Sequence, residues 1–201
     1  MPMHRRSWIA ATLGLALGAS THAQTVRRAT SAALMNDLMS GKGDVGQPFS
    51  LNDGWGRRRH LHDFRGKVVL LYFGYITCPD VCPTDLAAIA ELLQLLGKDA
   101  DSVQPIFVTL DPQRDTGRIM REYVAMFDSR IVGLRGTEAD TYRVATAFKT
   151  YYEKVPVPRA GTYFIDHTAF IYLLDRDGKY VSFFPPGTTP QRMQVMVREL
   201  L

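Results

Sequence analysis

The apolar positions of the chain follow two alternating patterns, one typical of buried strands and one typical of amphipathic helices. Short runs that are almost entirely apolar predict strands buried on both faces, at Lys67–Tyr75, Val103–Leu110 and Ile131–Leu134. After the first run, apolar residues spaced three and four positions apart predict a helix over Thr84–Leu96, which Gly97 would end. Strand and helix therefore alternate through the middle of the chain.

Helix-start signals mark three further helices. One begins at Asp115 or Thr116 and carries an apolar face, and the next begins at Thr137, where Asp140 resembles the second half of a capping box. The last begins at Thr189-Pro190, because proline suits the first helical position, where its missing N–H leaves no hydrogen bond unmade. Each signal is local and predicts where a helix begins.

Two hairpins flank this alternation. Phe49–Leu51 pairs with Arg59–Leu61, and Ala169–Leu174 pairs with Tyr180–Phe184 across the turn Asp175–Gly178. The predicted order is hairpin, strand, helix, strand, helix, strand, helix, hairpin and helix. This order predicts an α/β fold in which a central sheet with parallel strands has helices on both faces. A thioredoxin-like fold with an N-terminal β-hairpin fits it best.

The N-terminal segment has the composition of an export signal. His4–Arg6 is basic, Trp8–Ala19 is apolar, and small residues up to Ala23 offer a cleavage point. The apolar run is 12 residues long, whereas a helix that spans a bilayer needs about 20. We therefore expect residues 1–23 to be a cleaved signal peptide rather than a membrane anchor. The mature protein is then expected in the periplasm, an oxidising compartment in which a disulfide bond persists.

The remaining chain divides into a tether and one domain. Residues 24–45 are rich in Ala, Ser, Thr, Arg and Gly without firm periodicity, which predicts a flexible tether with one short helix around Ala32–Met39. Residues 46–201 form the predicted domain. The whole chain has 201 residues, 46% of them hydrophobic and 22% charged, which excludes a disordered, collagen-like or coiled-coil protein.

The charge balance gives no indication of a nucleic-acid partner. Lys and Arg total 24 against 20 Asp and Glu, and Arg5 and Arg6 lie in the expected signal peptide, which leaves 22 against 20. No basic stripe interleaved with aromatic residues is present in the sequence, so we expect no binding to nucleic acid.

The two cysteines carry the strongest chemical signal. Cys78 and Cys82 are separated by three residues in a Cys-Pro-Asp-Val-Cys-Pro motif, between a predicted buried strand and a predicted helix. Both sulfur atoms can reach a common point, and the N-terminus of a helix stabilises the thiolate that attacks disulfides and binds metals. An inert pair of buried thiols, or an inert local disulfide, is the alternative. We favour a redox or metal-binding pair.

A histidine near the C-terminus is a candidate third ligand. His167 lies in the segment Asp166–Thr168, immediately before the predicted strand at Ala169, and in a thioredoxin-like sheet the loop before the penultimate strand faces the cysteine loop. Two thiolates and one imidazole suit copper, Cu(I) in particular. The neighbouring Asp166 is a candidate partner that would orient the imidazole, although it is also suited to a turn.

Four segments of the chain, in the same order, resemble the Sco/SenC family of copper proteins. They are LLYFGYITCPDVCPTDL (Leu70–Leu86), VTLDPQRDT (Val108–Thr116), YYEKV (Tyr151–Val155) and DHTAFIYLLDRDGKY (Asp166–Tyr180). The resemblance covers Gly46 to Leu201. It implies a thioredoxin-like fold with a hairpin insert before the penultimate strand, and one copper ion, Cu(I) or Cu(II). In this chain the implied metal ligands are Cys78, Cys82 and His167.

The resemblance also implies a function and partners. It implies a copper chaperone, not an enzyme, that delivers copper to the binuclear copper centre of cytochrome c oxidase. The expected partners are the copper-bearing subunit of the oxidase and another periplasmic copper chaperone. We expect a monomer that meets the membrane only through its partner or through an uncleaved N-terminus. Members of the family are usually held to the membrane by an uncleaved helix, and the short apolar run departs from that pattern.

Other functions are alternatives. The main one is a thiol–disulfide oxidoreductase that keeps the acceptor's cysteines reduced, with Cys78 or Cys82 as the attacking thiolate. A peroxidase lacks the expected spacing around its cysteine, because Thr77 directly precedes Cys78. A structural zinc site normally has four protein ligands, and only three converge here.

Several other polar residues have simpler interpretations. His60 and His62 stand where family members usually have other residues, and a solvated hairpin face is favoured over an auxiliary metal site. Asp111 ends a strand and Asp115 precedes a helix, so we expect both to serve in turns or caps rather than in acid–base catalysis.

Overall fold

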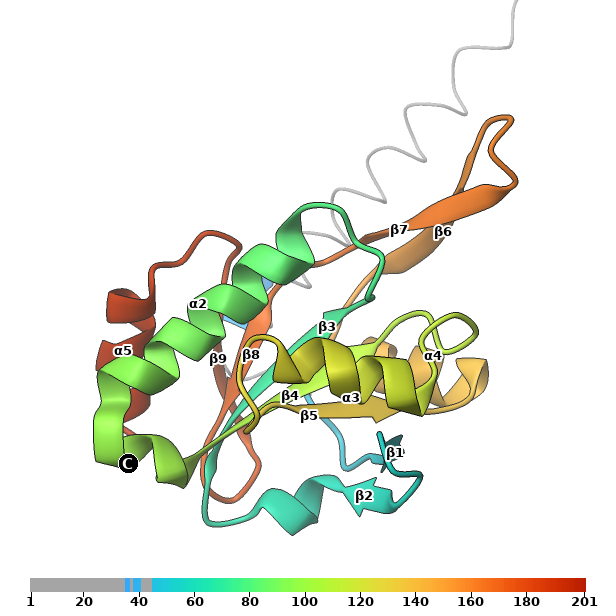
Figure 1. Cartoon of the computed structure of the whole chain (residues 1–201). Coiled ribbons are helices and arrows are strands. Elements are labelled where there is room, and N and C mark those ends of the chain that lie inside the picture. Colours follow the sequence, from blue (N-terminus) through green and yellow to red (C-terminus); the bar gives the residue numbers. More distant parts are fainter. Residues whose placement is uncertain (1–34, 37, 41–44) are drawn as a thin grey trace, which may run out of the picture. The chain divides into compact units, whose positions relative to one another are not determined.

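Figure 1 shows the computed structural model of the chain, which describes residues 35–36, 38–40 and 45–201. Two units are distinguished, Met1–Asn36 and Asp37–Leu201. The expected signal peptide lies outside the described residues. The helix expected around Ala32–Met39 lies only partly within them, and residues 35, 36 and 38–40 are helical. In the described part of the chain, no helix has both the length and the apolar character required to cross a membrane.

The second unit is built on a mixed sheet, in which the described residues form seven strands in the order β2-β1-β5-β4-β3-β8-β9. The strands are β1 (Ser50–Asp53), β2 (Arg58–His60), β3 (Val68–Gly74), β4 (Val103–Thr109), β5 (Val132–Arg135), β8 (Ile171–Leu174) and β9 (Tyr180–Phe184). The central strands β3, β4 and β5 are parallel, whereas β1 and β8 join them antiparallel. All seven strands lie close to the bounds that the apolar pattern predicts.

Helices connect and cover these strands. They are η1 (Leu61–Phe64), α2 (Val81–Leu96), η2 (Gly97–Ser102), α3 (Gly117–Ala125), α4 (Glu138–Ala147) and α5 (Pro190–Arg198). Helices α2 and α5 contact each other, and α2 and α3 lie together in front of the sheet in Figure 1. The capping box of Thr137 and Asp140 is present, and the Thr189 side chain accepts a hydrogen bond from the backbone N–H of Arg192.

Helix α2 begins at Val81, three residues before the predicted start at Thr84. Pro83 permits this earlier start, because in the first turn its missing N–H would have no intrahelical partner. Cys82 therefore lies in the first turn of α2, and Cys78 lies in the preceding loop. The helix ends at Gly97, which has a φ of 60°, as predicted.

A second, two-stranded sheet precedes β8. Strands β6 (Tyr152–Val157) and β7 (Thr162–His167) pair antiparallel with each other, and neither is hydrogen-bonded into the main sheet. Figure 1 shows this hairpin in orange, extending away from the main sheet. It is the hairpin insert expected before the penultimate strand. Together with the strand order, it confirms the α/β, thioredoxin-like fold.

The core lies on both faces of β3, because successive side chains of a strand point to opposite faces. Tyr72 packs near Phe107 on the face covered by α2. Phe73 points the other way and contacts the rings of Phe148, which follows α4, and of Tyr172. All five of these aromatic side chains have no solvent exposure. The strand that leads into the cysteine loop is therefore held rigidly from both sides.

Candidate metal centre

The two cysteines lie at the end of β3, where the chain turns into α2. The backbone N–H of Cys78 donates to the carbonyl of Tyr75 at 3.2 Å, which closes the turn before the helix. Both residues are free thiols, and Cys82 has no solvent exposure whereas Cys78 is 9% exposed. Cys78 is therefore the thiol that a ligand or a partner reaches first.

The last residue of β3 makes room for the buried sulfur. A Cβ atom at Gly74 would lie 2.7 Å from Sγ of Cys82, 3.0 Å from the Phe107 ring and 3.1 Å from the Tyr72 ring. Cβ atoms essentially never make nonbonded contacts as short as the first of these distances, so a larger residue would displace the thiol. Gly74 was not predicted as a site residue. The signal was its position two residues after Tyr72, on the same face of a strand.

His167 reaches the cysteines from the hairpin insert. It is the last residue of β7, paired with Tyr152, rather than a loop residue as the sequence predicted. Its Nε2 atom lies 3.6 Å from Sγ of Cys82, and its Nδ1 atom lies 3.2 Å from the carbonyl oxygen of Ile165. A carbonyl oxygen only accepts hydrogen bonds, so Nδ1 is the donor. In the neutral imidazole, the lone pair that a metal ion needs is then on Nε2, facing Cys82.

The environment separates the acidities of the two thiols. The hydrogen bond from the Cys82 thiol lowers the pKa of Cys78 to about 5, and burial opposes this shift. The backbone N–H groups of Asp80 and Cys82 lower the pKa further, and so does His167 when its imidazole is protonated. The same hydrogen bond to Cys78, together with burial, raises the pKa of Cys82. In the metal-free, reduced protein, Cys78 is therefore the thiolate at neutral pH and Cys82 is the proton donor to it.

Two buried polar side chains lie near Cys82. The hydroxyl of Tyr72 and the Oδ2 atom of Asp85 are buried without a hydrogen-bond partner of good geometry. Burial raises the pKa of both groups, and that of Asp85 reaches about 6. Asp85 lies one turn after Cys82 on α2 and was not predicted as part of the site. The sequence signal that could have identified Asp85 is a carboxylate on the apolar face of the predicted helix.

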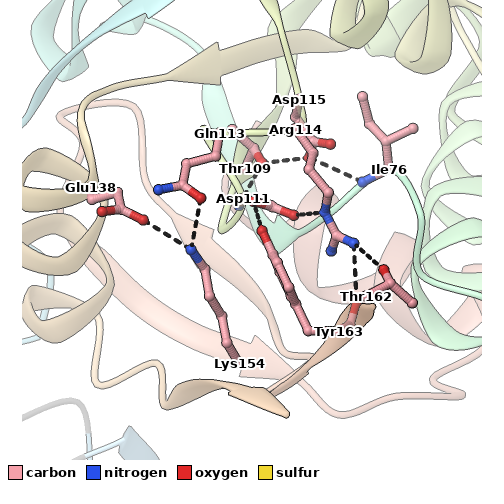
Figure 2. Close-up of polar contacts among 10 residues, drawn as sticks. All are labelled: Ile76, Thr109, Asp111, Gln113, Arg114, Asp115, Glu138, Lys154, Thr162 and Tyr163. Carbon is pink, nitrogen blue, oxygen red and sulfur yellow. Dashed lines mark hydrogen bonds and ion pairs between the residues drawn. The ribbon is translucent and has the colours of Figure 1, made fainter. Parts of the chain in front are cut away.

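Asp111 and Asp115 serve the turn between β4 and α3, as expected, but neither caps the helix. The N-cap residue of α3 is Thr116, and its side chain makes no capping hydrogen bond. The carboxylate of Asp115 instead accepts from the backbone N–H of Ile76, and that of Asp111 accepts from the hydroxyl of Tyr163 (Figure 2). These contacts reach the cysteine loop and β7.

Two of the three pairs of predicted ligands are therefore in contact. Cys82 contacts both Cys78 and His167, and the three donors are two soft sulfurs and one imidazole, a set that suits copper. Asp166 is exposed, and it is the carbonyl of Ile165 that contacts Nδ1 of His167. Within the described residues, no three or more Cys, His, Asp and Glu side chains are already arranged around one point as a metal site.

The chain matches known proteins over the whole of this domain. The family model described as SCO1/SenC matches residues 38–201. The mitochondrial SCO2 homolog of Danio rerio is 40% identical over 146 residues, which are 72% of this chain and 51% of that protein. The structure of Bradyrhizobium japonicum ScoI with copper bound is 44% identical and has a TM-score of 0.73, covering 78% of this chain and 99% of that one.

A more distant structure shares the fold. BsSco, described as a member of the Sco family of cytochrome c oxidase assembly proteins with a disulfide switch, is 22% identical and has a TM-score of 0.62. The similarity covers 78% of this chain and 92% of that one. At this identity the likeness concerns the fold alone.

Proposed function

This chain belongs to the SCO1/SenC family, and from that premise we propose that it is a copper chaperone. In this proposal it binds one copper ion through Cys78, Cys82 and His167 and delivers the ion to the binuclear copper centre of cytochrome c oxidase. Copper is cargo here, not a resident catalytic group. The copper-bound ScoI of Bradyrhizobium japonicum, 44% identical to this chain, supports the choice of metal.

The observation that carries the proposal is the contact between Cys82 and His167. Sγ of Cys82 and Nε2 of His167 are 3.6 Å apart, and Nδ1 of His167 contacts the Ile165 carbonyl. The imidazole is thus held by one nitrogen and presents the other to the buried sulfur. A histidine that only filled the core would have no need of this orientation toward a cysteine.

The donor set also suits transfer. Two thiolates hold Cu(I) without further help, and an imidazole adds a borderline ligand that stabilises Cu(II). Cys78 is already ionised at neutral pH because its pKa is about 5, so binding has to displace only the proton of Cys82. Cys78 is also the more exposed sulfur, and we expect an acceptor to approach the ion from its side.

The proposed compartment and partners follow from the same function. An N-terminal signal would export the protein to the periplasm, where residues 46–201 form the copper-binding domain. Its acceptor would be the copper-bearing subunit of the oxidase, and another periplasmic copper chaperone would supply the ion. Membership of the SCO1/SenC family, whose model matches residues 38–201, supports this place.

A thiol–disulfide oxidoreductase is the second candidate function. The observation in its favour is the separation of the two thiol acidities, with a pKa of about 5 for Cys78 and a raised pKa for Cys82. A thiolate beside a protonated thiol is the arrangement that attacks a substrate disulfide and then resolves the mixed disulfide. The two functions are compatible, because the acceptor's cysteines must also be reduced before they bind copper.

A Cu(I) titration against a chromophoric chelator tests the proposal. Fully reduced protein should bind one copper ion per chain, whereas Cys78→Ser and Cys82→Ser should each lose tight binding. His60→Ala is the matched control, because His60 lies outside the site, stacked on His62. Full stoichiometry in either cysteine variant would contradict the proposal. Protein oxidised at both cysteines should bind no copper, because a disulfide offers no thiolate.

A further inference from the structure

The turn between β4 and α3 lies beside the cysteine loop. The parallel register of β3 and β4 places Thr109 opposite Gly74, and the N–H of Leu110 donates to the carbonyl of Gly74 at 2.7 Å. Both strands therefore end side by side, and the residues that follow each of them are neighbours. The turn itself is tight, because the N–H of Asp115 donates to the carbonyl of Asp111 at 2.9 Å.

Asp115 connects this turn to the cysteine loop. Its Oδ2 atom accepts from the backbone N–H of Ile76 at 3.1 Å and from the hydroxyl of Thr109 at 2.6 Å. The side chain is 2% exposed. Ile76 lies two residues before Cys78, so the buried carboxylate holds the loop at a point close to the first sulfur. An N–H in this loop would otherwise be left without a partner.

Asp111 and Arg114 connect the same turn to β7. The buried carboxylate of Asp111 accepts from the hydroxyl of Tyr163 at 2.9 Å and from Nε of Arg114 (Figure 2). Nη1 of Arg114 donates to the backbone carbonyl of Tyr163 at 3.0 Å, and its guanidinium lies 3.9 Å from the centre of the Tyr163 ring. Tyr163 is thus held by its ring, its hydroxyl and its backbone. It lies four residues before His167, on the same face of the strand.

Arg114 also lies beside the site itself. Its guanidinium is 6.0 Å from the centre of the Tyr75 ring, and the Tyr75 ring meets the imidazole of His167 edge to face at 5.7 Å. The guanidinium therefore lies near both the Tyr163 ring and the Tyr75 ring. One of these rings belongs to the hairpin insert, and the other directly precedes the cysteine loop.

The hairpin insert needs such contacts to hold its place. Within the described residues, β6 and β7 pair only with each other, so no ladder of hydrogen bonds sets their angle to the main sheet. A two-stranded hairpin is marginally stable by itself. Another polar contact of the hairpin insert comes from Lys154, whose Nζ atom donates to Glu138 at 2.9 Å and to Gln113 at 3.4 Å on an exposed surface (Figure 2). Exposed ion pairs of this kind contribute little.

We propose that Asp111, Arg114 and Asp115 are positioning residues that anchor both halves of the copper site to one turn. Asp115 sets the cysteine loop through Ile76, and the Asp111–Arg114 pair sets His167 through Tyr163 and Tyr75. The distance between Nε2 of His167 and Sγ of Cys82 then depends on the turn. This inference rests on the proposed copper binding. The three residues that it adds do not themselves supply a copper-binding atom.

The test compares Arg114→Gln with Arg118→Gln, a matched control in which the replaced arginine is exposed and pairs with Glu122. His167 matters more to Cu(II) than to Cu(I). Arg114→Gln should therefore weaken Cu(II) binding by about 10- to 100-fold, the usual effect of losing a residue that orients a metal ligand. Cu(I) affinity should fall much less. Electron paramagnetic resonance of the Cu(II) form should show weakened coupling to the imidazole nitrogen. Arg118→Gln should match the wild type in all three measurements.

Two further measurements test the contacts of the turn one at a time. Tyr163→Phe removes only the hydroxyl group that donates a hydrogen bond to Asp111. It should also weaken Cu(II) binding, by a smaller factor than Arg114→Gln does. In the metal-free protein, amide hydrogen exchange should become faster along β6 and β7 in Arg114→Gln and at Ile76 in Asp115→Asn. If Arg114→Gln fails to fold, Tyr163→Phe and Asp115→Asn decide the question.

The possible results separate this inference from the proposed function. Copper binding by the wild type, with Arg114→Gln and Tyr163→Phe both indistinguishable from Arg118→Gln, would overturn the anchor and leave the proposed function in place. An equal loss of Cu(I) and Cu(II) affinity would also overturn it, because the damage would then not be specific to His167. A wild-type protein that binds no copper would overturn the proposed function and the inference with it.

Discussion

The Nε2 atom of His167 lies 3.6 Å from the Sγ atom of Cys82, although 85 positions separate the two residues in the chain. Cys82 reaches this point from the first turn of α2, and His167 reaches it from the last position of β7. The imidazole cannot rotate freely, because its Nδ1 atom contacts the carbonyl of Ile165 and its ring packs edge to face with the ring of Tyr75. This relationship separates the two candidate functions.

His167→Ala should distinguish copper delivery from disulfide chemistry. Thiol–disulfide exchange needs only the two sulfurs, so the variant should still form and reduce the Cys78–Cys82 disulfide. It should lose Cu(II) binding severely and Cu(I) binding less, because two thiolates satisfy Cu(I) in a near-linear geometry. Cytochrome c oxidase activity, measured in cells with normal levels of the variant and no added copper, is the deciding readout. Wild-type oxidase activity would favour the reductase function.

The acidity of Cys78 should depend on the hydrogen bond from Cys82. That bond is the largest cause of the pKa of about 5, so Cys82→Ala should raise the pKa of Cys78 toward its ordinary value of 9.0. Cys82→Ser is the matched control, because a hydroxyl still donates a hydrogen bond and should hold the pKa lower than alanine does. The ultraviolet absorbance of the thiolate, followed against pH in metal-free protein, gives both values. Equal pKa values in the two variants would exclude this cause.

Gly74→Ala should destabilise the fold through a clash with one atom. The added Cβ would lie 2.7 Å from Sγ of Cys82, and overpacking of a well-filled core costs about 1–3 kcal/mol in the free energy of unfolding. In a Cys82→Ala background that sulfur is gone, so the same substitution should cost less. A double-mutant cycle by denaturant unfolding measures the coupling. Additive effects would show that the clash lies with the Phe107 or Tyr72 ring instead.

Asp85 should make the folded protein less stable as the pH rises. Burial raises its pKa from 3.8 to about 6, so the folded state binds the proton more tightly than the unfolded state. The stability that this proton provides is complete below the unfolded pKa and is lost as the pH rises through the folded one. Relative to wild type, Asp85→Asn should therefore gain about 2–3 kcal/mol between pH 4 and pH 7. If the unfolding free energies of the two proteins changed in parallel across this pH range, the raised pKa of Asp85 would be refuted.

Local features of this protein were predictable from its sequence. The apolar runs that became β3, β4 and β5 and the capping box of Thr137 and Asp140 are recognisable because burial and helix capping depend on residues a few positions apart. The same holds for the Cys78–Cys82 motif, whose spacing alone brings two sulfurs together. The strand–helix order was enough to predict the thioredoxin-like fold.

The site as a whole was decided only by the tertiary structure. Strands β6 and β7 alternate weakly between apolar and polar residues because both are only partly buried, so the pattern gave no sign that His167 ends a strand. The partner of Asp115 is Ile76, which lies 39 positions away, and the two meet because the register of β3 and β4 aligns the ends of those strands. A local pattern records which residues are buried, but contacts between distant residues depend on strand order, register and the angle of the hairpin insert.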